Sequence, residues 1–135
     1  MNKILLIITG SIAASKCKEI ITLLNINEVK ISCILTKEAK KYVKISDIKK
    51  LLKNRIFTDE DEKKNKMLHI NLSRDNDIIV MCPATANSIA KFANGYGDNL
   101  ASNTLLASNK KILFVPAMNS FMWHNKINQK NVRLL

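Results

Sequence analysis

Two asparagine-bearing loops combine residue types and spacing that could support chemistry. An apolar stretch at 77–82 (DIIVMC) runs into Pro83–Asn87 (PATAN), and a second at 111–115 (KILFV) runs into Pro116–Asn119 (PAMN). The carboxyl ends of parallel strands lie along one edge of a sheet, so both loops are predicted to meet at the same rim.

The second loop is unusually apolar for a turn that faces water. Asn119 is set between Met118 and Phe121, whereas turns are normally rich in Gly, Asp and Ser. One carboxamide in such surroundings indicates the wall of a ligand site, where a few polar groups fix orientation. A hydrophobic plug beneath a neighbouring element is the alternative.

The stretch before this loop predicts a strand buried on both faces. Residues 112–115 are apolar without interruption, as in the central strands of parallel sheets. Pro116 has no N–H to donate and is predicted to end the hydrogen-bond ladder.

The amino-terminal stretch predicts a strand, a glycine turn and a helix. Residues 3–9 (KILLIIT) lead into Gly10, and the apolar residues of 11–24 recur at helical spacing with Ser11 as the N-cap. The N–H groups at such a helix start suit a phosphate. With only Gly10 present, this is not the GxGxxG fingerprint, and a plain turn is the alternative.

A second strand is predicted at 29–35, which brings Thr36 to the same edge as Gly10. Thr36 is either a ligand contact or a simple N-cap for 37–43. The charged run 59–66 (DEDEKKNK) predicts a surface loop. Further helices are expected at 46–52, 88–93 and 100–107, with a helix start in 124–135.

His69 is a lone histidine among apolar neighbours. Such a residue is commonly a satisfied, partly buried side chain. It is also a candidate acid or base near neutral pH.

Composition restricts the class of protein. The 135 residues allow one domain, with 47% hydrophobic and 24% charged residues. The net charge of +11 raises nucleic acid as a partner, but the lysines are dispersed and Tyr42 is the one aromatic residue in the basic stretch 37–53, which argues against it. We expect no membrane span, signal peptide or metal site. The odd number of cysteines favours free thiols and a cytoplasmic location.

Four motifs, taken together in this order, resemble the flavin-dependent cysteine decarboxylases, in particular the phosphopantothenoylcysteine decarboxylases of coenzyme A synthesis. They are TGSIAA at 9–14, HINLSR at 69–74, PATAN with GDNL at 83–87 and 97–100, and PAMNSFMW at 116–123. The resemblance covers essentially the whole chain, and the last motif is the most specific.

The resemblance implies an α/β fold, with a Rossmann-like, flavodoxin-type parallel sheet and helices on both faces. It implies one FMN-binding domain over 1–135 and a homo-oligomer, a trimer or a multiple of trimers. Members of the family continue past the PAMN loop with another strand and a flap that carries a proton-donating cysteine. Because this sequence ends at Leu135, we expect a carboxy-terminally shortened domain.

The resemblance also assigns roles to individual residues. His69 would be the catalytic base, Asn119 would hold the substrate carboxylate, and Met122 would contact the substrate. Glu38 stands where relatives often carry a small hydroxyl residue. The residues expected at FMN are Gly10, Ser11, Ile12, Thr36, Lys37, Glu38, Thr85, Ala86, Asn87, Ser88 and Ala117.

The reaction that the resemblance implies is decarboxylation of 4'-phosphopantothenoylcysteine to 4'-phosphopantetheine. In that chemistry the flavin first accepts a hydride from the carbon that bears sulfur, and carbon dioxide then leaves. A peptide that ends in cysteine is an alternative substrate for the decarboxylation. An alternative function is that of a non-catalytic FMN-binding subunit, because Cys17, Cys33 and Cys82 do not lie where the flap cysteine would be.

Overall fold

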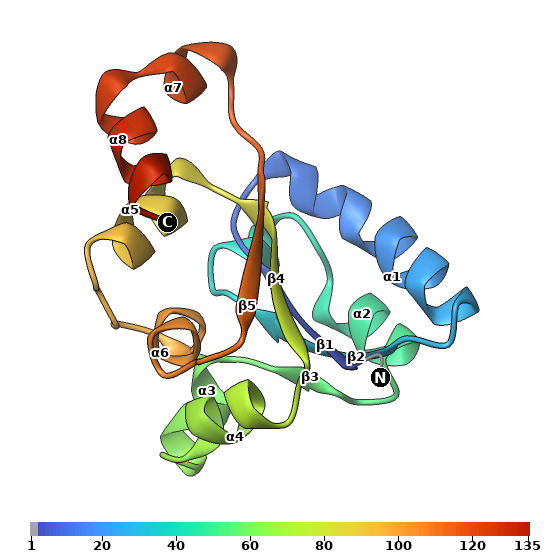
Figure 1. Ribbon diagram of the computed structural model, residues 1–135. Helices are drawn as coiled ribbons and strands as arrows, with labels where there is room; N and C mark the ends of the chain where they lie inside the picture. The colour runs from blue at the N-terminus through green and yellow to red at the C-terminus, as the bar shows by residue number, and fades with distance from the viewer. Residues whose placement is uncertain (1–2) are drawn as a thin grey trace.

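A five-stranded parallel sheet forms the centre of the computed structural model, which describes residues 3–135 (Figure 1). Its strand order is β3-β2-β1-β4-β5. Apart from the two-residue β3, the strands follow the second-first-third-fourth order of flavodoxin-like sheets, which confirms the predicted fold class. The strands are β1 (Lys3–Ile8), β2 (Lys30–Leu35), β3 (Ile56–Phe57), β4 (Ile78–Ala84) and β5 (Lys111–Pro116).

The helices expected at 46–52, 88–93, 100–107 and 124–135 begin within two residues of their predicted starts, whereas the sequence did not predict helices at 68–74 and 120–124. Helices cover both faces of the sheet. They are α1 (Cys17–Ile26), α2 (Ile45–Leu51), α3 (Asp59–Lys64), α4 (Leu68–Arg74), α5 (Ala86–Ala93), α6 (Leu100–Leu106), α7 (Ser120–His124) and α8 (Lys126–Leu134), with 3-10 turns η1 (Ile12–Lys16) and η2 (Ala39–Lys41). In residues 3–135, no helix has both the length and the apolar character needed to cross a bilayer.

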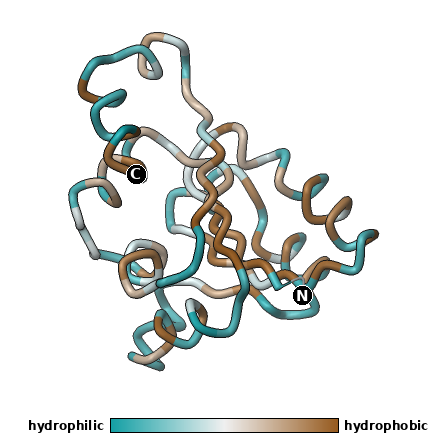
Figure 2. The backbone as a smooth tube through the Cα atoms, viewed as in Figure 1, coloured by the Kyte–Doolittle hydropathy of each residue, from teal (hydrophilic) through white to brown (hydrophobic). Residues whose placement is uncertain are grey.

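β1 divides the core into two layers. Leu6 and Ile8 pack on the face that α1 and α2 cover, and Leu5 and Ile7 pack on the face that α4, α5 and α6 cover. Successive strand residues point to opposite faces, so a strand covered on both sides must be apolar throughout. Figure 2 shows this as a hydrophobic centre within more polar helices.

The predicted surface loop at 59–66 is wrong, because 59–64 forms α3. The Asp61 carboxylate accepts the backbone N–H of Thr58 at 2.8 Å, which satisfies one free donor at the helix start. Four acidic residues lie in the first turn and two lysines in the last, an order that suits the helix dipole. Charge order, rather than apolar periodicity, is therefore the signal for this helix.

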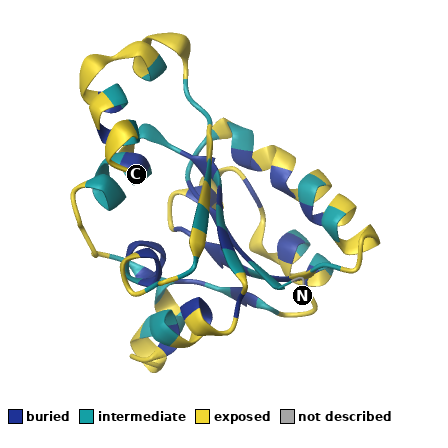
Figure 3. Ribbon diagram, viewed as in Figure 1, coloured by how far each residue is buried: buried dark blue, intermediate teal, exposed yellow. Residues whose placement is uncertain are grey.

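The expectation that 112–115 is buried on both faces is also wrong. Phe114 packs against Phe92 of α5 with 5.4 Å between the ring centroids, but Leu113 and Val115 on the opposite face are 51% and 39% exposed. Within the described residues, β5 is an edge strand that pairs with β4 alone. Figure 3 shows exposed segments along this strand and over α7 and α8.

Pro116 does not end the strand, contrary to prediction. It lies opposite Ala84, beside an irregularity in the β4–β5 pairing, and β5 includes it. The next residue, Ala117, donates its N–H to the Ala84 carbonyl at 3.2 Å. An edge strand tolerates proline because the missing donor need not face a neighbouring strand.

Candidate functional site

A cavity of about 360 Å³ opens where the strand order reverses, at the carboxyl ends of β1, β2 and β4. Its volume lies within the range of small-molecule pockets, and ligands of open α/β sheets bind at this position. The predicted residues that line it are Gly10, Ser11, Thr36, Glu38, Thr85, Ala86, Asn87, Ser88, Ala117 and Met122. The expectation that the two Pro-Ala loops reach one rim is confirmed.

The loop after β1 is tied to both of its neighbours. The Thr9 hydroxyl donates to the Pro83 carbonyl oxygen of β4. A Cβ atom on Gly10 would collide with the Cβ of Glu38 in the loop after β2. Gly10 is therefore required by the close approach of two strand-end loops. Ser11 caps η1 by accepting the N–H of Ala13 at 3.1 Å.

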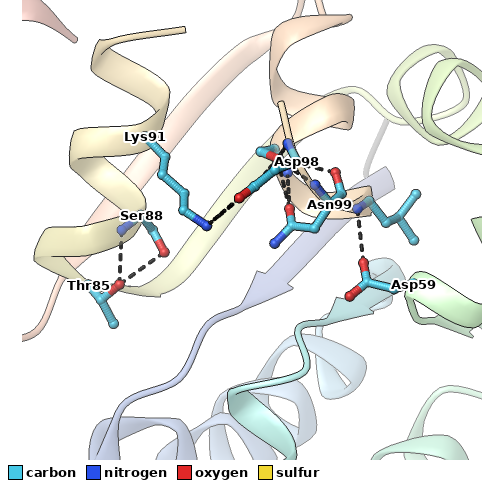
Figure 4. Close-up of polar contacts among 8 residues, drawn as sticks. Asp59, Thr85, Ser88, Lys91, Asp98 and Asn99 are labelled. Atoms are coloured by element: carbon cyan, nitrogen blue, oxygen red, sulfur yellow. Dashed lines mark hydrogen bonds and ion pairs between the residues drawn. The ribbon is translucent and has the colours of Figure 1, made fainter. Parts of the chain in front are cut away.

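The loop after β4 presents the start of α5 to the cavity. Thr85 Oγ1 accepts the N–H of Ser88 at 3.1 Å and donates to the Ser88 hydroxyl at 2.9 Å (Figure 4). The N–H groups of Ala86 and Asn87 belong to the first helical turn, where backbone donors have no intrahelical acceptor. These donors suit an anionic group.

One wall of the cavity comes from the segment before α6, which the sequence reasoning did not assign to the site. Lys91 Nζ lies 3.0 Å from Asp98 Oδ2, and this hydrogen bond lowers the pKa of the exposed Asp98 carboxyl. Asn99 caps α6 by accepting the N–H of Ser102 at 2.8 Å (Figure 4). The GDNL motif at 97–100 contains Asp98 and Asn99, and it is the sequence feature that could have predicted this wall.

Most other lining residues escaped prediction because they are core or helix positions that look structural in the sequence, whereas Met118 belongs to the loop already predicted as a wall of a ligand site. Met81, Phe92, Leu105 and Met118 supply apolar surface. The further unpredicted residues are Thr9, Lys91, Asn99, Ala101 and Ser102.

Four predicted site residues do not line this cavity, and their roles stay predictions. Ile12 is 79% exposed on η1, and Lys37 borders a neighbouring hollow lined by both lysines and acidic residues. Asn119 is the N-cap of α7, where its Oδ1 accepts the N–H of Met122 at 2.9 Å. His69 lies on α4, with Nδ1 3.2 Å from Glu62 Oε1.

The donor set fits a flavin. An apolar wall faces a rim of hydroxyl, amide and backbone N–H groups, so a flat aromatic ring and a phosphate would each find matching surroundings. Residues 3–135 contain no group of three or more His, Cys, Asp or Glu side chains that would hold a metal ion.

Comparisons with known proteins agree with this chemistry. Residues 1–135 match the profile of the Flavoprotein family. The probable phosphopantothenoylcysteine decarboxylase of Streptococcus mutans is 32% identical over 99% of this chain and 77% of its own length. The bifunctional coenzyme A biosynthesis protein of Haemophilus influenzae is 35% identical, and the match covers 95% of this chain but 32% of that protein.

Solved structures of cysteine decarboxylases are also similar to this chain. The FMN-dependent cysteine decarboxylase SpaF superposes with a TM-score of 0.93 at 29% identity, covering 100% of this chain and 79% of that one. A PPC decarboxylase variant in complex with pantothenoylaminoethenethiol superposes with a TM-score of 0.86 at 30% identity, and the match covers 99% of this chain and 76% of that one. By sequence and fold, the chain belongs to the flavoprotein family of phosphopantothenoylcysteine decarboxylases and related cysteine decarboxylases.

Proposed function

We propose that this chain binds FMN in the cavity at the β1–β4 strand ends and decarboxylates 4'-phosphopantothenoylcysteine to 4'-phosphopantetheine in coenzyme A synthesis. The supporting observation is the pairing of an apolar wall with a hydroxyl and N–H rim at the point where the strand order reverses. Bound FMN would supply the hydride acceptor and donor that this chemistry needs.

Two loops would hold the cofactor phosphate. Gly10 and Ser11 offer close approach after β1, and the first turn of α5 offers backbone N–H groups after β4. Glu38 would repel a phosphate, but its charge is offset by Lys41, whose Nζ is 2.8 Å from Glu38 Oε2 and lowers the pKa of that carboxyl. Thr36 and Ala117 would border the rest of the cofactor.

Asn119 would hold the substrate carboxylate with its amide nitrogen. Its Oδ1 is already engaged by the Met122 N–H, so the free Nδ2 presents two donors. A carboxylate accepts such donors well, and fixing it orients the adjacent carbon for loss of carbon dioxide. His69 would handle the proton. Because His69 does not line the cavity of its own chain, a second copy would have to bring it there.

We therefore also propose a homo-oligomer, a trimer or a multiple of trimers. Phe121, which is 89% exposed on α7, supports a subunit contact. A cytoplasmic location is supported by Cys17, Cys33 and Cys82, which are all free thiols.

The test is an absorbance spectrum of the purified chain, followed by anaerobic addition of substrate. We expect a flavin spectrum that bleaches with 4'-phosphopantothenoylcysteine, and mass spectrometry should show loss of carbon dioxide. Bleaching only with a peptide that ends in cysteine would reassign the substrate to a peptidyl cysteine. Bound flavin without a reaction would indicate a non-catalytic subunit. A chain that cannot be loaded with FMN would overturn the proposal.

A further inference from the structure

We propose that Glu62 is the positioning residue for His69. Its carboxylate holds the proton on Nδ1 and leaves Nε2 as the nitrogen that exchanges protons. The catalytic consequence rests on the proposed function, whereas the Glu62–His69 pairing is testable without it.

The pairing follows from the chemistry of the two groups. His69 Nδ1 is shielded from solvent and lies 3.2 Å from Glu62 Oε1, but the orientation of the two groups falls outside that of a hydrogen bond. A carboxylate has only acceptor sites. An unprotonated Nδ1 would therefore place its lone pair against those of the carboxylate. The neutral ring avoids this by carrying its proton on Nδ1, and its basic lone pair is then on Nε2.

Glu62 is held in place by α6. The oxygen that faces His69 also accepts Asn103 Nδ2 at 3.2 Å. One turn earlier on both helices, Asp59 Oδ1 accepts the N–H of Leu100 at 3.0 Å (Figure 4). Two contacts one turn apart therefore dock α3 on α6 and fix the carboxylate in front of the ring.

The loop before α6 leaves space for Asn103. A Cβ atom on Gly97 would lie 2.5 Å from Asn103 Oδ1, so a side chain there would push Asn103 aside. Glycine at this position leaves room for the Asn103 side chain that contacts Glu62. The Glu62 and His69 side chains are only 20% and 25% exposed, so solvent screens their interaction less than that of a surface pair.

The other acids of α3 have partners of their own. Asp59 binds the start of α6, Asp61 binds the Thr58 N–H, and Glu60 pairs with Lys63 at 3.3 Å. Glu62 is therefore the carboxylate of α3 that faces the ring. Glu60, exposed on the same helix, provides a matched control.

The test is the tautomer of His69, measured from the ¹⁵N chemical shifts of its ring in the purified chain. The sequence contains two histidines, so a His124→Gln variant assigns the signals. We expect the Nδ1–H tautomer in the unmodified chain, a shift toward Nε2–H in Glu62→Ala, and no change in Glu60→Ala. Asn103→Ala should shift the tautomer in the same direction by releasing Glu62.

Activity provides the second readout. Glu62→Ala should lower kcat about tenfold or more with KM little changed, because proton transfer is affected rather than binding. Circular dichroism checks that the Glu62→Ala variant folds. If it does not fold, Glu62→Gln, which keeps an acceptor for Asn103, replaces it in both measurements. Nε2–H in the unmodified chain, or a tautomer that is unchanged in both Glu62 variants, would overturn the pairing. The expected tautomer in an inactive chain would contradict the proposed function instead.

Discussion

The two Pro-Ala loops begin with the same dipeptide and have different surroundings. Pro83 and Ala84 are buried, with Ala84 0% exposed, whereas Pro116 is exposed and Ala117 is half-buried. Each loop then caps a helix with a polar side chain: Thr85 caps α5 and Asn119 caps α7.

The difference comes from the neighbouring strands. β4 lies between β1 and β5, whereas β5 is the edge of the sheet in the described residues. Local sequence therefore specifies the loop and its helix cap, whereas the adjacent strands determine how deeply each loop is buried. The first loop is a buried wall of the cavity, and the second is more exposed to solvent.

The largest effect should come from the more exposed loop. Asn119→Ser keeps a side-chain oxygen that can cap α7 but removes the amide donors, so kcat/KM should fall about 100-fold, or about 2.7 kcal/mol. The free energy of unfolding should change by less than about 0.5 kcal/mol. Steady-state kinetics and thermal melting separate the two readouts. Full activity in this variant would remove Asn119 from substrate binding.

The next largest effect should distinguish the alanines of the two Pro-Ala loops, Ala84 and Ala117. Ala84→Leu forces a large side chain into a closed core and should lower the free energy of unfolding by about 2 kcal/mol. Ala117→Leu should leave stability nearly unchanged and weaken flavin binding, because Ala117 lines the cavity. Urea denaturation and flavin titration of both variants provide the comparison. Equal destabilisation would mean that the second loop is as closely packed as the first.

A smaller effect is expected at the first helix cap. Thr85→Ala removes the acceptor for the Ser88 N–H and should cost about 1 kcal/mol of unfolding free energy. Thr85→Ser retains the hydroxyl and should cost much less. If both variants melted at the temperature of the original chain, the cap would contribute nothing to stability.

The smallest effect concerns reactivity rather than stability, at the residue before Pro83. Cys17 Sγ lies 3.2 Å from the Cys82 carbonyl oxygen, and the neighbouring Cys17 thiol lowers the pKa of Cys82 to about 7. The thiolate is then populated above that pH, so alkylation by iodoacetamide should speed up as pH rises from 6 to 8 and level off beyond it.

The other thiols should react slowly over that range. Burial raises the pKa of Cys33, and the contact with Cys82 raises that of Cys17. A Cys82→Ser variant identifies the signal by mass spectrometry. An alkylation rate that keeps rising beyond pH 8 would show that the Cys17 S–H stays with the carbonyl oxygen.

Sequence reasoning located the strand ends well because proline, glycine and continuous apolar runs mark them locally. Gly10, Thr36 and the two Pro-Ala loops were placed at one edge on this basis. It missed α3 because all six residues of that helix are charged, and it missed the exposure of Leu113 because burial depends on which strands and helices are adjacent.

The contact between Glu62 and His69 could not have been predicted from spacing. The two residues lie on different short helices, and α6 fixes the carboxylate from a position 41 residues away in sequence. Local pattern carries no information about such a contact. The lining contributed by Phe92 and Leu105 was missed for the same reason.

The central position of β1 also has a consequence for folding during synthesis. β1 pairs with β2, about 27 residues later, and with β4, as the contact between the Lys3 N–H and Asp77, 74 residues apart, illustrates. A growing chain can form the first pairing early but must wait for β4 before β1 is covered on both sides. Until the ribosome has released β4, one edge of this largely buried strand is open to other chains.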